Sequence, residues 1–179
     1  IQQLPVNFEG DYYLLVNIDD AVFPLDNTPV ITLISENRGT TERLGTENQR
    51  TERPHTSSDG ILVVYERTDI NGIQQVFLRN METGDTTLIS NSVTSANFNT
   101  GANGNSLRPR ISGDGSTIVF HSRATDLVIG DTNGHEDVFV YKIQTGQLIR
   151  AEQFSTGEEA NEASFYPDVN EIGNMVVFE

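Results

Sequence analysis

Short apolar runs alternate with polar segments along most of the chain. Residues 61–65 and 138–141 consist of β-branched, aromatic and leucine side chains, and each run lies between segments rich in Gly, Asp, Asn, Ser and Thr. Runs of about four to eight such residues between turn-forming residues are typical of buried β-strands. The abundant Asn, Asp, Ser and Thr favour turns and are poor helix formers. The pattern therefore predicts an all-β chain without long helices.

The strand pattern recurs as an internal repeat. Residues 53–90 and 108–150 align position by position, a third copy opens at 166 and runs to 179, and residues 31–39 fit an earlier, partial copy. The aligned pairs are Pro54 with Pro109, Asp59 with Asp114, Gly60 with Gly115, Val76 with Val138, and Gly84 with Gly146. Because a repeat decides the architecture, it takes precedence over the assignment of single strands.

Each repeat unit has the parts of a four-stranded antiparallel meander. A proline opens a short first strand, where its missing N–H is tolerated, and the Asp-Gly pair forms a tight turn into an apolar second strand. The third strand is expected at 75–79 or 137–141. A Thr-Gly turn then leads into the fourth strand, at 86–89 or 147–150.

Stacked sheets of this kind form a β-propeller. One such sheet cannot bury both of its faces alone, so we expect neighbouring sheets to pack around an axis. The turn glycines recur at intervals of 45 and 62 residues, and the first interval matches a propeller blade. A β-sandwich also has short strands, but it gives no reason for a Pro, Asp-Gly, Gly register to recur. The predicted blades of this single propeller segment are 1–45, 46–90, 105–150 and a partial blade at 160–179.

A resemblance to a known family is carried by residues 108–141, which read R-P-R-I-S-G-D-G-S-T-I-V-F-H-S-R-A-T-D-L-V-I-G-D-T-N-G-H-E-D-V-F-V-Y. This segment resembles the TolB-type β-propeller repeat, a WD-repeat-like motif common in exported bacterial proteins. The resemblance covers roughly residues 50–179. It implies a periplasmic or extracellular propeller that makes protein contacts and is often joined to other modules. It implies no reaction.

The number of blades predicts an incomplete ring. At about 45 to 60 residues per blade, 179 residues supply fewer blades than the roughly four to eight with which propellers close. We therefore expect the remaining blades to come from a longer chain or from another subunit.

The charge balance excludes some classes of partner. The chain has 11 Lys and Arg against 26 Asp and Glu, a net charge of −15, and its cations are scattered singly. Nucleic acid is therefore disfavoured as a partner. The absence of cysteine excludes disulfides and thiolate chemistry, and no apolar stretch approaches the length for membrane insertion. These features are compatible with an exported protein.

Two loops are candidate calcium sites. Oxygen ligands at alternate positions around a glycine, followed by a carboxylate, are the minimal pattern of a calcium loop. The alternative is a hairpin turn in which Asp and Asn bond their own backbone and no metal is needed. The candidate ligands are Asp131, Asn133 and Asp137 in one loop, and Asp69 and Asn71 in the other.

The residues that flank the blade-opening prolines form a candidate surface for a protein partner. Because the first strand of a blade lines the central channel, these side chains are expected to gather near one mouth of it. Arg and Tyr are enriched in binding hot spots, although plain solvation of strand ends explains the same positions. The six residues are Arg53, His55, Arg108, Arg110, Tyr166 and Asp168.

The sequence gives no support for catalysis. It contains neither the H-E-x-x-H pattern of zinc peptidases nor the G-x-S-x-G pattern of serine hydrolases. We therefore predict an exported, non-catalytic module for protein binding or scaffolding. The alternatives are an accessory or gating propeller of a larger enzyme, such as a serine peptidase, and a structural subunit that completes its sheets with a neighbouring chain.

Overall fold

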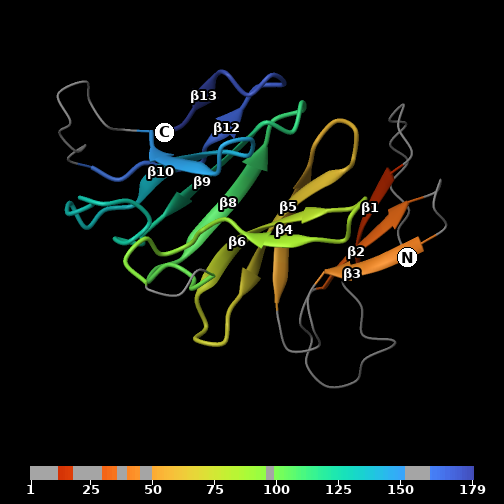
Figure 1. The fold of residues 1–179 in the computed structure, drawn as a ribbon, viewed down its shortest axis with the longest axis horizontal. Helices are drawn as coiled ribbons and strands as arrows, with labels where there is room; N and C mark the ends of the chain where they lie inside the picture. The colour runs from red at the N-terminus through yellow and green to blue at the C-terminus, as the bar shows by residue number, and fades with distance from the viewer. Residues whose placement is uncertain (1–11, 18–29, 36–39, 45–49, 96–98, 152–161) are drawn as a thin grey trace. The chain divides into compact units, whose positions relative to one another are not determined.

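The structure is a computed structural model and describes residues 12–17, 30–35, 40–44, 50–95, 99–151 and 162–179. In these residues all regular structure is β-strand (Figure 1). The chain divides into two compact units, Ile1–Glu52 and Arg53–Glu179, which are described in turn. Within the described residues there is no helix of the length and apolarity that crossing a membrane requires.

The first unit contains a three-stranded antiparallel sheet in the order β1-β2-β3. Its strands are Tyr12–Asn17 (β1), Val30–Ser35 (β2) and Thr40–Leu44 (β3). The turn glycine expected at Gly39 lies outside the described residues.

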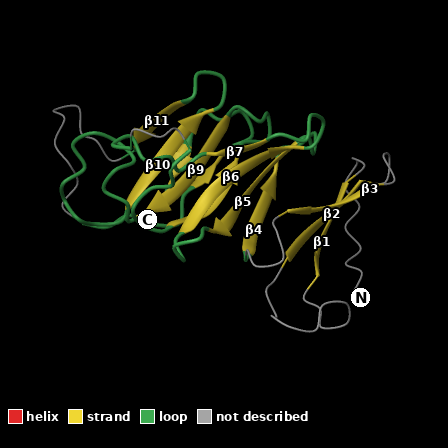
Figure 2. Cartoon of the chain, turned by 60° about the horizontal axis from the view of Figure 1, so that its bottom comes forward, coloured by secondary structure: helices red, strands yellow, loops and turns green. Residues whose placement is uncertain are grey.

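The second unit contains two four-stranded antiparallel sheets and a two-stranded one. The first sheet consists of Thr51–Thr56 (β4), which starts at the boundary between the units, Leu62–Thr68 (β5), Gln74–Asn80 (β6) and Thr86–Leu88 (β7). The second consists of Ser106–Ile111 (β8), Thr117–Ser122 (β9), Asp137–Lys142 (β10) and Gln147–Arg150 (β11). Asp168–Val169 (β12) and Val176–Val177 (β13) form the pair. In both larger sheets the strands are neighbours in chain order, which confirms the predicted all-β fold of four-stranded meanders (Figure 2).

The sheets of the second unit pack face to face. Strand β8 lies against β5 and β6 of the preceding sheet, and β12 lies against β8 and β9. All six residues of β9 are buried, because one face of this strand meets each neighbouring sheet. The apolar core between the two larger sheets includes Val64, Ile111 and Phe120, and Phe120 stacks on Phe139 with ring centroids 5.7 Å apart. A strand buried on both faces needs a continuous apolar run, which is the pattern of the sequence.

Hairpin turns of successive sheets meet at one end of the first strands. The backbone N–H of Ser58 donates to the carbonyl of Gly113 at 2.8 Å, and that of Asp114 donates to the carbonyl of Glu171 at 2.8 Å. Ser58 Oγ also donates to Glu171 Oε1 at 2.8 Å. A side chain at Gly113 would overlap the Glu171 carboxylate. Glycine at this position therefore lets the turns of three sheets come together.

Candidate functional site

At the opposite end of the first strands, the residue before each blade-opening proline has an unusual backbone. Arg53, Arg108 and Tyr166 have φ values of 48°, 52° and 52°. A positive φ is uncommon for residues with a side chain. Its occurrence at three equivalent positions makes it a recurring feature of the repeat in this chain. In β8 the pairing with β9 shifts register between Leu107 and Arg110, which is a β-bulge. The bulge turns the N–H of Arg108 out of the ladder.

That free N–H is taken up by a carboxylate of the preceding sheet. Arg108 N–H donates to Glu66 Oε1 at 2.6 Å, and Arg53 Nη1 donates to Glu66 Oε2 at 2.8 Å. The same Oε2 accepts a hydrogen bond from Gln74 Nε2 at 3.1 Å. Only 1% of the Glu66 side chain is exposed, and a carboxylate so deeply buried requires donors of this kind. Glu66 thus joins the first strands of two sheets.

His121 occupies the equivalent position in the second sheet and faces the third repeat. Its ring lies 5.7 Å from that of Phe165 and 6.0 Å from that of Tyr166. Only 4% of His121 is exposed, and neither ring nitrogen has a hydrogen-bond partner in the described part of the chain. Burial, followed by the charges of Arg108 and Arg53, lowers the pKa of His121 to about 4. The imidazole is therefore neutral at pH 7, although Glu136 Oε1 lies 3.4 Å from Nδ1.

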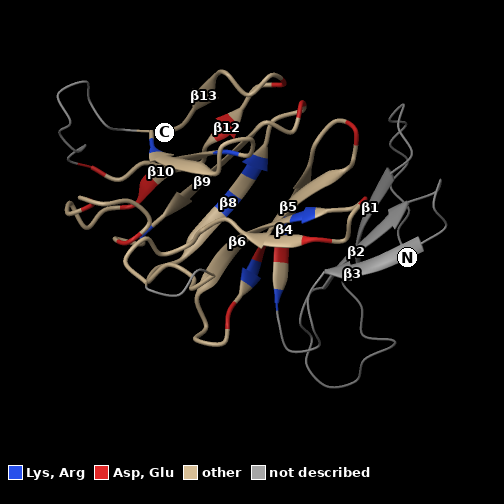
Figure 3. Cartoon of the chain, in the orientation of Figure 1, with Lys and Arg blue, Asp and Glu red and all other residues tan. Residues whose placement is uncertain are grey.

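Arg108 is held over an exposed aromatic ring. The guanidinium carbon of Arg108 lies over the Tyr166 ring, 4.5 Å from its centroid, which is a cation–π contact. Tyr166 itself is 49% exposed. In the described residues no carboxylate lies within ion-pair distance of Arg108 or Arg110, whereas Arg53 pairs with Glu66. Figure 3 shows the basic residues along β8.

The residues after the prolines are also brought within electrostatic range of one another. His55 Nδ1 accepts a hydrogen bond from the N–H of Ile111 at 3.3 Å. Burial lowers the pKa of His55, the Arg110 guanidinium lowers it further, and Asp168 opposes this effect. Five of six residues, here named the proline-flanking cluster, lie on the successive first strands β4, β8 and β12, and Tyr166 lies two residues before β12; the six are Arg53, His55, Arg108, Arg110, Tyr166 and Asp168. Their role in binding stays a prediction.

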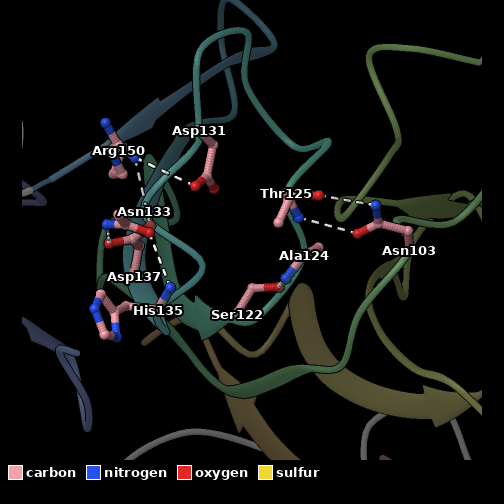
Figure 4. A network of polar contacts seen from close by, with 9 residues as sticks. All are labelled: Asn103, Ser122, Ala124, Thr125, Asp131, Asn133, His135, Asp137 and Arg150. Atoms are coloured by element: carbon pink, nitrogen blue, oxygen red, sulfur yellow. Dashed lines mark hydrogen bonds and ion pairs between the residues drawn. The ribbon is translucent and has the colours of Figure 1, made fainter. Parts of the chain in front are cut away.

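The candidate calcium loop contains a buried arginine. Arg150 Nη1 lies 3.5 Å from Asp131 Oδ1 and 3.4 Å from Asp137 Oδ2, and at most 5% of each of these side chains is exposed (Figure 4). Asn133 turns its amide nitrogen towards Asp137 Oδ1 at 3.1 Å, and its Oδ1 accepts the N–H of His135 at 2.9 Å. Among the described residues no group of three or more His, Asp or Glu is placed to hold a metal ion. These residues fit an ion-pair network better than a calcium site, so calcium binding here stays a prediction from the sequence.

The second candidate loop forms a hydrogen-bonded turn. Asp69 Oδ1 accepts the N–H groups of Asn71 at 2.8 Å and Ile73 at 2.9 Å. Both acceptor bonds are made within the hairpin itself, as in an Asx turn. The turn is satisfied by its own backbone, and calcium at Asp69 and Asn71 likewise stays a prediction.

The sequence alone did not identify the residues that contact and position the candidate site residues. Glu66 and His121 align as polar residues that follow an apolar run, but their contacts are with the next repeat. Arg150 lies at the end of β11, distant in sequence from the loop that it neutralises. The aligned polar positions are the signal from which Glu66 and His121 could have been found.

Comparison with known proteins shows the fold. No protein-family model and no curated protein matches the sequence. Among solved structures, TolB from Acinetobacter baumannii is 17% identical over 93% of this chain and 34% of that chain, with a TM-score of 0.53. The putative TolB from Agrobacterium tumefaciens is 17% identical over 99% of this chain and 59% of that one, with a TM-score of 0.56. The tricorn protease is 14% identical over 84% of this chain and 13% of that one, with a TM-score of 0.53.

The chain spans about a third of the length of the A. baumannii TolB. At these identities the likeness concerns the fold and not the activity. Together with the face-to-face packing of four-stranded sheets, it shows that the chain has a β-propeller fold.

Proposed function

We propose that this chain is part of an exported, non-catalytic β-propeller that binds a protein partner through the proline-flanking cluster. The observation that carries the proposal is the Arg108 guanidinium, which lies over the exposed Tyr166 ring without a carboxylate partner in the described residues. Arginine and tyrosine are enriched among the residues that dominate binding energies. A side chain that is already fixed also loses little conformational entropy when a partner binds.

The scaffold beneath Arg108 supports this assignment. The buried Glu66 holds the Arg108 backbone at 2.6 Å and the Arg53 side chain at 2.8 Å. The three residues before the prolines have the same positive φ, so the repeat presents them in the same way from each first strand. Binding sites need such support from a second layer of residues.

Export rests on the resemblance to the TolB-type repeat together with the cysteine-free, acidic composition. The net charge of −15 is spread over the whole chain, so the binding partner need not be a basic protein. Fractionation of cells that make the full-length protein tests the location.

Charge reversal tests the binding proposal. We expect Arg108→Glu and Arg110→Glu to abolish co-purification of the native partner while circular dichroism shows unchanged folding. Arg79→Glu is the matched control, because Arg79 lies at the far end of β6 from Gln74 and Glu66 and bonds Thr86 Oγ1 at 3.0 Å. Unchanged partner recovery with both cluster variants contradicts the proposal.

A second candidate function is an accessory propeller of a larger enzyme. The fold likeness to the tricorn protease favours it. The alignment covers 84% of this chain but only 13% of that protein, so the matching part is a small portion of a larger enzyme. The full-length reading frame decides between the two. An adjoining α/β segment with a G-x-S-x-G motif supports the enzyme, and further repeats without one support the binding module.

A further inference from the structure

Two arginines of the proline-flanking cluster, Arg108 and Arg110, form no ion pair within the described part of the chain. The protein has a net charge of −15, yet β4 carries Arg53 and β8 carries Arg108 and Arg110, one residue to each side of Pro109. Both oxygens of Glu66 already accept hydrogen bonds from Arg53 and from the Arg108 backbone. Glu136 lies between His121 and Arg123. Asp168, the carboxylate of the cluster itself, accepts the N–H of Val169, and no described carboxylate forms an ion pair with the guanidinium groups of Arg108 and Arg110.

The pKa values of the two histidines in this region are lowered by burial and by arginines of the cluster. The pKa of His121 is lowered by Arg108 and Arg53 beyond the effect of burial, and that of His55 is lowered by Arg110. Neutral histidines add no charge, so at pH 7 the charged side chains of the cluster are its three arginines and Asp168. The surroundings favour an added anion.

A buried polar group in the same region, the His121 imidazole, makes no hydrogen bond with the described residues. His121 is 4% exposed and both of its ring nitrogens are without a hydrogen bond in the described residues. The ring lies against Tyr166, on which Arg108 is stacked. Glu136 Oε1 lies 3.4 Å from Nδ1 without forming a hydrogen bond, and a buried imidazole N–H that makes no hydrogen bond costs free energy.

The geometry selects the kind of anion. A planar guanidinium presents parallel N–H donors, the arrangement that a carboxylate accepts in a bidentate manner, and that of Arg108 lies beside the exposed Tyr166 ring. The acidic surface of the rest of the chain repels long polyanions such as nucleic acid. A short segment with isolated carboxylates is repelled less than a long polyanion, and the exposed Tyr166 ring offers apolar contact for its backbone or side chains.

We propose that the proline-flanking cluster binds a carboxylate group of an extended, acidic peptide segment in the protein partner, with Arg108 and Arg110 as the anion-binding residues. This inference rests on the proposed function and specifies the chemistry of the partner. The carboxylate belongs either to an Asp or Glu side chain or to a chain terminus, and both present the same two oxygens.

Fluorescence anisotropy with a set of labelled Gly-Ser peptides tests the inference. One peptide carries internal Glu residues and an amidated end, a second carries Gln and a free terminal carboxylate, a third carries Gln and an amidated end, and a fourth carries Lys. We expect binding of the first or the second, and the stronger of the two identifies the source of the carboxylate. We expect the third and fourth to bind at least about tenfold more weakly, and added salt to weaken the binding of the acidic peptides.

Variants separate the role of charge from that of folding. Arg108→Gln and Arg110→Gln are expected to weaken the acidic peptide at least about tenfold each, whereas Arg79→Gln leaves it unchanged. Arg108→Lys keeps the charge and loses the planar pair of donors, so it restores binding only in part. Should Arg108→Gln fail to fold, Arg110→Gln carries the test.

Three results overturn the inference. The first is that the neutral peptide binds as tightly as the acidic peptides and is weakened equally by Arg108→Gln. The cluster would then bind a peptide without recognising its carboxylate. The second is binding of inorganic phosphate without binding of either carboxylate peptide. The third is the absence of binding by any peptide while cross-linking at Tyr166 still captures a partner, which separates failure of this inference from failure of the proposed function.

Discussion

Arg108 and Glu66, which lie 42 residues apart, join two sheets through a backbone N–H to carboxylate hydrogen bond of 2.6 Å. The bond exists because a β-bulge before Pro109 turns the Arg108 N–H away from its own ladder. It fixes the backbone beneath the side chain that we assign to partner binding. We therefore expect stability and the proposed partner binding to depend on the same residue pair.

Removal of the Glu66 carboxylate is expected to destabilise the second unit. In Glu66→Ala the Arg108 N–H and the Arg53 guanidinium lose their acceptor, and loss of a buried ionic partner costs about 3 kcal/mol of the free energy of unfolding. Denaturant unfolding measures the change. Glu66→Gln retains one acceptor and should lose less, and the exposed Glu162→Ala is the control with little change. An equal effect of Glu66→Ala and Glu162→Ala would show that the contact contributes nothing.

Acid is expected to destabilise the fold through His121. An ordinary histidine titrates near 6.5, whereas the pKa of folded His121 is about 4. Between these values the unfolded chain binds a proton at this imidazole and the folded chain does not, so the free energy of unfolding falls as the pH falls from about 6.5 to about 4. His55, whose pKa is also lowered, contributes with the same sign.

His121→Phe isolates that contribution. The substitution keeps an aromatic ring against Phe165 and Tyr166 and removes the proton site, so the pH dependence in this range should become shallower. Ile70→Ala, at an exposed position, changes no titratable group and should leave the dependence unchanged. The same slope in His121→Phe and in the wild type is the contrary outcome.

Arg150 is expected to act as the resident cation of the loop at residues 131–137. Arg150→Gln leaves Asp131 and Asp137 buried without the guanidinium that lies about midway between them, and we expect a loss of roughly 3 kcal/mol in the free energy of unfolding. Calcium should then raise the Tm of the variant by replacing the lost charge, and a chelator should reverse this. A rise of similar size in the wild type would favour the calcium site predicted from the sequence.

Gly113→Ala should be costly only while Glu171 is present. A methyl group at this position overlaps the Glu171 carboxylate and displaces it from Ser58 Oγ, so we expect a loss of about 1 kcal/mol, which is modest because the glutamate can move. In a Glu171→Ala background the same substitution should be nearly neutral. A double-mutant cycle by thermal unfolding measures the coupling. Additive effects would show that the turns do not depend on this contact.

The repeat register predicts the fold well because each of its parts has a local physical cause. The Asp-Gly pairs at 59–60 and 114–115 form the expected hairpins, with φ of 68° at Gly60 and 70° at Gly115. The apolar runs became β5, β6, β9 and β10, within a few residues of the expected bounds. These features depend on neighbouring residues and are visible in a single sequence.

The site was less predictable because its contacts join separate repeats. The positions of Arg53, Arg108 and Tyr166 followed from the prolines, but their positive φ did not, since a residue before proline ordinarily adopts an extended backbone. The pairing of Glu66 with Arg108 and of Arg150 with Asp131 requires knowledge of which sheet edges meet. Spacing within one repeat does not contain that information.

Photo-cross-linking from position 166 tests most directly the claim that this end of the propeller binds a protein. Tyr166 is replaced by p-benzoylphenylalanine in cells that make the full-length protein, and the exposed Thr87 on β7 receives the same residue as a control. We predict one defined protein adduct from position 166, none from position 87, and loss of the adduct when Arg108→Glu is added. The absence of an adduct from position 166, or an adduct that persists with Arg108→Glu, contradicts the account.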